Sequence, residues 1–214
     1  MKDNYAAVLE EAQREFAQKN TMDMARASGA SLSLYPPLSW REYLLPYLGR
    51  AYRVIWPTGE VLLYPTKKEA SATTALIIIH YLTKACGKPP AGKWLPFNQL
   101  WGGDSYYQAF KRRALQPLAE FFGDKEKLFS ELMLGRLQAR PGKEPRSYLL
   151  MALPRLPLLV RLEPGDDEVP PRAILLFDAI ANEYLPTEDL AAIGENLAAR
   201  LLRWGREFMK AGGE

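Results

Sequence analysis

The residues best suited to bind a ligand lie in two stretches that are far apart in the sequence. The first, residues 87–113, reads GKPPAGKWLPFNQLWGGDSYYQAFKRR, in which glycines and aromatic residues are interleaved before a basic triplet. Glycine lets a backbone approach a ligand closely, aromatic rings offer flat faces, and lysine or arginine pairs with carboxylate or phosphate. This composition is compatible with binding of a nucleotide, a planar cofactor or single-stranded nucleic acid. The alternative is a long irregular connection pinned by its aromatic side chains, and the stretch contains neither GxGxxG nor a phosphate-loop motif.

The second stretch carries carboxylates. Asp178 directly follows an apolar run that predicts a strand, and Glu188 and Asp189 stand at the start of the last predicted helix. Asp178 can cap the short apolar turn at residues 179–181. Thr187 can cap the last helix, whose dipole favours negative charge in its first turn. The alternative is that one of these acids lines a site.

The candidate ligand-binding residues come from the aromatic stretch, from the acids, and from one arginine between them. They are Lys93, Trp94, Gly102, Gly103, Asp104, Tyr107, Arg155, Asp178, Glu188 and Asp189. A binding or catalytic cleft requires the two stretches to converge around an open hollow. A purely structural role predicts instead that the aromatic residues are buried and that the acids bond only backbone amides.

Metal and redox chemistry have few possible ligands in this sequence. The single Cys86 cannot form an internal disulfide or a Cys-rich zinc or iron–sulfur site. The single His80 excludes a multi-histidine centre, and its apolar surroundings favour a helix position in or near the core. The acidic triplet at residues 166–168 is expected to form a solvated turn, because consecutive acids point in different directions. We therefore expect neither a metal nor a cofactor.

Length and composition indicate an ordinary globular protein. The chain has 214 residues, of which 48% are hydrophobic and 25% charged, and a formal net charge of +3. This charge is too small for a nucleic-acid footprint, so we expect no nucleic-acid partner. No apolar run approaches the roughly 20 residues that span a bilayer, and the N-terminus is acidic and amphipathic rather than a secretory signal. These features predict a cytoplasmic protein without membrane attachment.

The first part of the chain predicts a helix followed by a β-hairpin. A single amphipathic helix starts the chain and ends near Gly29. Residues 51–56 and 60–64 are rich in aromatic and β-branched residues, and the Pro-Thr-Gly turn between them predicts a hairpin. Thr66 and Glu69 then have the spacing of a capping box, which predicts a helix over residues 67–85 with a buried apolar middle.

The remaining sequence predicts helices on either side of a strand meander. The expected elements are helices from residue 104 or 105 and over 125–137, strands over 148–153, 156–162 and 173–177, and a last helix over 188–209. Pro117 is expected to bend or split the first of these helices. The hydrophilic loop at residues 140–146 is a candidate subdomain boundary.

These elements predict an α+β fold. An antiparallel sheet, built from the N-terminal hairpin and the C-terminal meander, packs with a central buried helix and an amphipathic C-terminal helix. The whole chain, residues 1–214, is expected to form a single domain.

Two segments together resemble the signature blocks of a family. They are LTKACGKPPAGKWLPFNQLWGGDSYYQAFKRRALQPLAEFFG at residues 82–123 and ALPRLPLLVRLEPGDDEVPPRAILLFDAIANEYLPTEDLAAIGENLAARLL at residues 152–202, with the pieces GKW, GG, LFD and LPTED. The family is an uncharacterised bacterial and archaeal one that is catalogued as a domain of unknown function and is frequent in anaerobes. Some relatives carry a fused iron–sulfur domain similar to one in corrinoid proteins. The resemblance implies an iron–sulfur or corrinoid protein as a partner and no transferable activity.

Three functions are compatible with these features. The first is an accessory or binding protein for a small anionic or planar ligand, in the context of anaerobic one-carbon metabolism that the resemblance implies. The second is an enzyme in which Asp178 or Glu188 acts as acid or base beside Lys93 or Arg155. The third is a structural or oligomerisation module.

Overall fold

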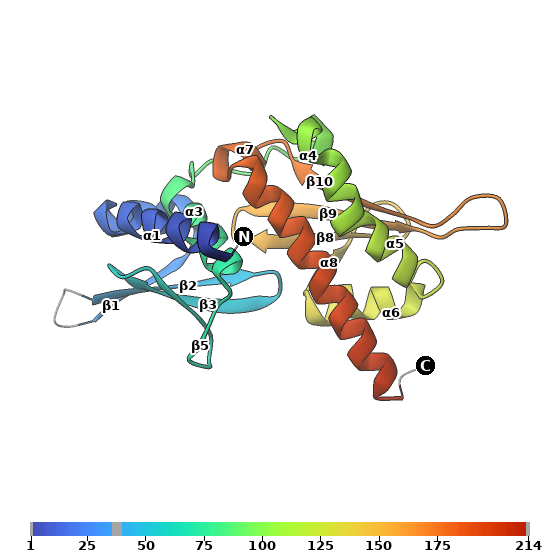
Figure 1. Ribbon diagram of the computed structural model, residues 1–214, viewed down its shortest axis with the longest axis horizontal. Helices are drawn as coiled ribbons and strands as arrows, with labels where there is room; N and C mark the ends of the chain where they lie inside the picture. The colour runs from blue at the N-terminus through green and yellow to red at the C-terminus, as the bar shows by residue number, and fades with distance from the viewer. Residues whose placement is uncertain (1, 36–39, 213–214) are drawn as a thin grey trace. The chain divides into compact units, whose positions relative to one another are not determined.

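The computed structural model describes residues 2–35 and 40–212 and confirms the α+β class. The chain forms two compact units. The first comprises Met1–Pro90, Ala152–Leu156 and Glu183–Pro186, and the second comprises Ala91–Met151, Pro157–Asn182 and Thr187–Glu214. The N-terminal hairpin and the C-terminal meander lie in two separate five-stranded sheets (Figure 1). The hydrophilic loop at residues 140–146 lies inside the second unit.

The first unit begins with two helices where one was predicted. Helix α1 (Lys2–Gln18) is followed by α2 (Thr21–Ser28) after a break at residues 19–20. Asn20 causes the break, because its Oδ1 accepts hydrogen bonds from the first amides of α2 at 2.9 and 3.2 Å and so caps that helix. Gly29, with a φ of +74°, ends α2 as predicted.

Helix α3 (Ala72–Lys84) is the predicted buried helix, but it begins later than predicted. Ser71 caps it by accepting a hydrogen bond from the amide of Thr74 at 3.3 Å. Thr66, the predicted cap, instead accepts from the amide of Lys68, the first residue of β5 (Lys68–Glu69), which pairs with strand β4. The capping-box prediction is wrong because strand pairing recruits residues whose local pattern indicated a helix.

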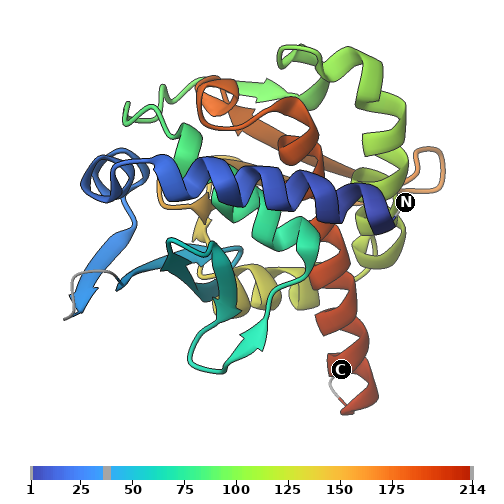
Figure 2. The ribbon, with the colours of Figure 1, turned by 60° about the vertical axis from the view of Figure 1, so that its left-hand side comes forward.

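The sheet of the first unit is a meander. Its strands, in spatial order, are β1 (Ser31–Tyr35), β2 (Trp40–Tyr47), β3 (Arg50–Trp56), β4 (Glu60–Leu63) and β5. The β3–β4 pairing confirms the predicted hairpin. On β2, Tyr43, Leu45 and Tyr47 are buried, and the Tyr43 ring lies 5.8 Å from that of Phe16 on α1. Helices α1 and α3 cover this face of the sheet (Figure 2).

The sheet of the second unit has the strand order β6-β10-β9-β8-β7. The strands are β6 (Trp94–Pro96), β7 (Arg140–Pro141), β8 (Ser147–Leu153), β9 (Leu156–Glu163) and β10 (Arg172–Asp178). The predicted strands of the C-terminal meander are confirmed as β8, β9 and β10. Strand β6 comes from the aromatic stretch, where no strand was predicted, and it pairs with β10.

The second unit contains the helices α4 (Gly103–Phe110), α5 (Gln116–Phe122), α6 (Glu126–Glu131) and α8 (Thr187–Lys210), with π-helical segments at Lys111–Leu115 and Leu132–Arg136. Helix α7 (Ala181–Tyr184) contains residues of both units. Figure 1 draws α8 across strands β8 to β10, with α5 beside it. The predicted apolar stripe of α8 is buried at Leu190, Leu197 and Leu201. Helices α4 and α5 and the edge of β10 frame the site described next.

Candidate functional site

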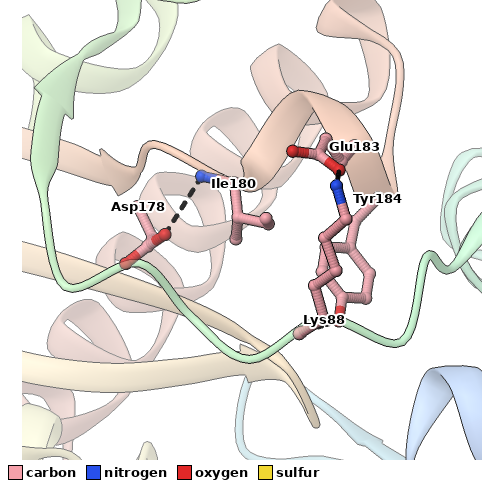
Figure 3. A network of polar contacts seen from close by, with 5 residues as sticks. All are labelled: Lys88, Asp178, Ile180, Glu183 and Tyr184. Carbon is pink, nitrogen blue, oxygen red and sulfur yellow. Dashed lines mark hydrogen bonds and ion pairs between the residues drawn. The ribbon is translucent and has the colours of Figure 1, made fainter.

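Asp178 joins the aromatic and acidic stretches through backbone hydrogen bonds. It ends β10, is fully buried, and lies opposite the half-buried Trp94. Its Oδ1 accepts from the amides of Ala91 (2.9 Å) and Ile180 (3.0 Å), and its Oδ2 accepts from Gly92 (2.7 Å). Figure 3 shows the contact with Ile180. A buried carboxylate requires such partners, so Asp178 fixes both the turn after β10 and the start of the aromatic stretch.

A second set of hydrogen bonds fixes the turn at Trp101. Its backbone N–H donates to Asn182 Oδ1 at 3.0 Å, and its carbonyl oxygen accepts from the Thr187 hydroxyl. That hydroxyl also accepts from Asn182 Nδ2 at 3.1 Å. The Trp101 side chain, in contrast, is 84% exposed. The aromatic and acidic stretches therefore converge within the second unit, but the polar groups at their meeting point are hydrogen-bonded to one another.

Backbone geometry accounts for both glycines of the Gly102-Gly103 pair. Gly102 precedes α4 with a φ of +72°, a left-handed conformation that favours glycine. Gly103 is buried, and a Cβ atom on it would lie 1.9 Å from the carbonyl oxygen of Phe97. Close packing of one backbone on another thus explains the pair without a ligand.

Glu188 meets a tyrosine that the sequence did not single out. The Tyr106 hydroxyl donates to Glu188 Oε1 at 3.2 Å, and this hydrogen bond, together with the carboxylate charge, raises the pKa of Tyr106. The acid–base alternative paired Asp178 or Glu188 with Lys93 or Arg155. The structure gives Asp178 backbone amides and Glu188 a tyrosine as partners, and the acid–base alternative stays a prediction.

The other sequence candidates lie at the surface or in different surroundings. Lys93 and Asp104 are exposed. Asp189 is buried in the first turn of α8, where the helix dipole favours a carboxylate. Arg155 belongs to the first unit, where its guanidinium donates to the carbonyl oxygen of Arg26 at 3.3 Å.

The second unit carries an open hollow of about 410 Å³ beside α4 and α5. The helices form one wall, and the prolines before β10 and the start of that strand form the other. The lining residues are Tyr107, Lys111, Leu115, Gln116, Ala119, Glu120, Pro170, Pro171, Arg172 and Ala173. Tyr107 is the sequence candidate among them. The volume lies in the range of small-molecule sites, roughly 300 to 1,000 Å³.

A π-helical turn shapes the helical wall. It spans Lys111–Leu115, and the Gln116 amide donates to the carbonyl oxygen of Lys111. The buried row of this helix comprises Phe110, Ala114, Leu118 and Phe122. On an α-helix of 3.6 residues per turn, each residue of such a row is rotated by about 40° around the helix axis relative to the one four positions before it. The π-helical turn has more residues per turn and therefore reduces this rotation. Pro117, which has no amide to donate, follows this turn, and helical residues continue on both sides of it, so the predicted split does not occur.

Close contacts between proline and glycine hold the opposite wall. A Cβ atom on Gly123, at the end of α5, would lie 2.5 Å from Pro171 Cβ. A Cβ atom on Gly165 would lie 2.7 Å from Pro171 Cδ. Because neither glycine leaves room for a side chain, Pro171 packs directly on two backbones and the wall has a defined position.

Polar side chains around the hollow have no side-chain partner among the residues that the structure describes. They are Lys111, Gln116, Glu120 and Arg172. Arg113 lies on the same helical segment but outside the hollow, and it pairs with Glu195 at 3.5 Å. The hydrogen-bonding capacity at the hollow is therefore available to a ligand.

Sequence reasoning did not select most of these residues. Lys111 was noted only as part of a basic triplet, and Glu120 and Arg172 were not noted at all. The four-residue spacing of Tyr107, Lys111 and Leu115 could have placed them on one side of a helix. Arg172 had no such signal, because it comes from a strand far along the chain.

The acidic triplet forms the expected solvated turn. Asp166 Oδ1 accepts from the amides of Val169 (2.7 Å) and Glu168 (3.0 Å), and these bonds lower the pKa of Asp166. Asp167 and Glu168 are exposed. Among residues 2–35 and 40–212, no group of three or more His, Cys, Asp or Glu side chains is placed to hold a metal ion.

The single cysteine lies beside a tyrosine cluster in the first unit. The Tyr184 hydroxyl donates to the carbonyl oxygen of Lys88, whose ammonium pairs with Glu183 (Figure 3). Burial, and then hydrogen bonding with Cys86, raise the pKa of Tyr184 to about 12. The ring of Tyr184 stacks on that of Tyr81 with centroids 5.7 Å apart. These contacts tie residues 183–184 to the segment that follows α3.

The fold defines an α+β protein of two compact units, one of which carries a hollow of small-molecule size. The chain belongs to the family described as a domain of unknown function, DUF3786, whose model matches residues 22–200. This match confirms the family resemblance noted in the sequence. No curated protein and no solved structure matches the chain.

Two further expectations from the sequence concern membrane attachment and a protein partner. No helix in the described part of the chain is long and apolar enough to cross a membrane. The iron–sulfur or corrinoid partner implied by the resemblance stays a prediction.

Proposed function

We propose that the second unit binds a small organic ligand in the hollow between α4–α5 and the start of β10. The proposal rests on one observation: a hollow of about 410 Å³ is lined by apolar residues and by polar side chains that have no side-chain partner among the residues that the structure describes. Small-molecule sites combine an apolar lining with a few polar groups that orient the ligand. Leu115, Ala119 and Ala173 supply the apolar part here.

The π-helical turn supports the same location. Single π-turns inside α-helices occur frequently at functional sites. The turn at Lys111–Leu115 directs two consecutive residues, Leu115 and Gln116, into the lining of the hollow.

A matched pair of tryptophan substitutions tests the proposal. Gln116 and Gln108 are both exposed on one continuous helix, but only Gln116 lines the hollow. The probe is 8-anilinonaphthalene-1-sulfonate, a flat aromatic anion whose binding is followed by its fluorescence. Gln116→Trp should weaken dye binding at least tenfold, because a large ring then occupies part of the hollow. Gln108→Trp should leave the affinity within about twofold.

Native mass spectrometry of the purified protein provides a second readout. A small molecule that co-purifies with wild-type protein should persist in Gln108→Trp and disappear in Gln116→Trp. Equal dye affinity in both variants, with both folded by circular dichroism, would overturn the proposal.

A further inference from the structure

We infer that the ligand of this hollow is an elongated organic anion, with its negative group against Lys111 and its apolar body extending toward Ala119. This inference rests on the proposed function and specifies the chemistry of the same site. It follows from the way in which charge is distributed along the hollow.

The two walls of the hollow run in opposite directions. Pro171, just before β10, packs on Gly123 at the end of α5, whereas the ring of Phe177, late in β10, lies 6.2 Å from that of Phe110 at the end of α4. Arg172 therefore lies toward the α5 end of the hollow. Glu120 shares that end, three residues before Gly123.

Lys111 marks the other end. It precedes Glu120 by nine helical residues, a separation of about 13 Å at a rise of 1.5 Å per residue. Tyr107, one turn earlier, adds a hydroxyl that can donate to the same group. The hollow is thus long enough to separate the two ends of a small molecule.

The Lys111 end carries positive charge that no carboxylate on the helix neutralises. The residues three and four positions away, whose side chains neighbour Lys111 on a helix, are Tyr107, Gln108, Ala114 and Leu115. An anion placed here gains a charge-assisted hydrogen bond from the ammonium.

The opposite end has no net charge. Glu120 and Arg172 both line it, so one carboxylate and one guanidinium balance each other. Between the ends, the apolar Leu115, Ala119 and Ala173 line the hollow together with Gln116. A molecule with one anionic end, an apolar middle and a neutral polar end matches this order. A cationic end would be repelled by the Lys111 ammonium.

Two dyes that differ by one charged group test the inference. 8-Anilinonaphthalene-1-sulfonate carries a sulfonate, and N-phenyl-1-naphthylamine has the same rings without it. Lys111→Met keeps an unbranched side chain of similar helix propensity and removes the charge. Arg112→Met is the matched control, because Arg112 is exposed on the same turn but does not line the hollow.

The quantity to measure is the affinity for the sulfonate dye divided by that for the neutral dye. In Lys111→Met this ratio should fall about fivefold, the effect of one partly exposed charge contact. In Arg112→Met it should change less than about twofold. Added salt should weaken sulfonate binding more in wild type than in Lys111→Met, because salt screens the contact with the ammonium.

The outcomes separate the inference from the proposed function. If Gln116→Trp abolishes binding of both dyes but Lys111→Met leaves their ratio unchanged, the hollow binds ligands and the anion inference is wrong. The same holds if Arg112→Met lowers the ratio as much as Lys111→Met. If Gln116→Trp affects neither dye, the proposed function itself is wrong.

Discussion

Replacing Asp178 by alanine should destabilise the protein, because the carboxylate is buried and holds three backbone amides. It accepts from Ala91, Gly92 and Ile180 at distances between 2.7 and 3.0 Å and has no exposed surface. The variant leaves all three N–H groups without their acceptor. If Asp178 instead served chemistry in an open cleft, its loss would leave stability nearly intact.

The expected magnitude follows from the surroundings of each amide. A hydrogen bond to a charged group contributes about 1.5 to 3 kcal/mol, and an unsatisfied buried donor costs about 1 to 3 kcal/mol. Ile180 is buried and bears this cost in full, whereas Ala91 and Gly92 are exposed, so water can replace part of their loss. We therefore expect Asp178→Ala to lower the free energy of unfolding by about 3 to 5 kcal/mol.

Urea unfolding, followed by tryptophan fluorescence, measures this loss. Asp167→Ala is the matched control, because Asp167 is exposed in the β9–β10 connection, and it should change the free energy by less than about 0.5 kcal/mol. Hydrogen exchange at the amides of Ala91 and Ile180 should accelerate in Asp178→Ala alone. If that variant does not fold, Asp178→Asn retains one acceptor oxygen and should show a smaller loss. A loss below about 1 kcal/mol with unchanged exchange would refute the anchoring role.

Two further predictions concern packing and pH. Gly103→Ala places a Cβ atom 1.9 Å from the Phe97 carbonyl oxygen and should lower the free energy of unfolding by more than about 2 kcal/mol. In Gly135→Ala the new Cβ atom meets no atom within 4 Å, so this variant should be neutral or stabilising. Thermal unfolding of both variants checks this prediction. The pKa of Tyr184 is raised to about 12 in the folded protein, so the unfolded chain releases the hydroxyl proton at a lower pH than the folded protein does. The stabilisation that the protonated Tyr184 hydroxyl contributes is therefore complete below about pH 10 and is lost as the pH rises toward 12. Tyr184→Phe should flatten the fall of the unfolding free energy across that window, and an unchanged slope would contradict the assignment.

Several elements could be predicted because their signals are local. The β3–β4 hairpin follows from a Pro-Thr-Gly turn between runs of aromatic and β-branched residues. The burial of α3 follows from an apolar surface on nearly all sides, and α8 from its apolar stripe. An error arose where strand pairing competed with a helix signal. Residues 68–69 have the sequence of a helix start, but they pair with β4 instead.

By itself, the sequence determined the α+β class, the family, most strands and helices, and the limits that one cysteine and one histidine place on chemistry. Hydrophobic period, turn residues and composition carry that information over short stretches. Only the tertiary structure decided that Asp178 is an anchor and that Lys111, Glu120 and Arg172 share one hollow. That hollow exists because β10 packs against the α4–α5 helix with Pro171 on two glycines. Such packing depends on residues distant in the chain, and no local pattern records it.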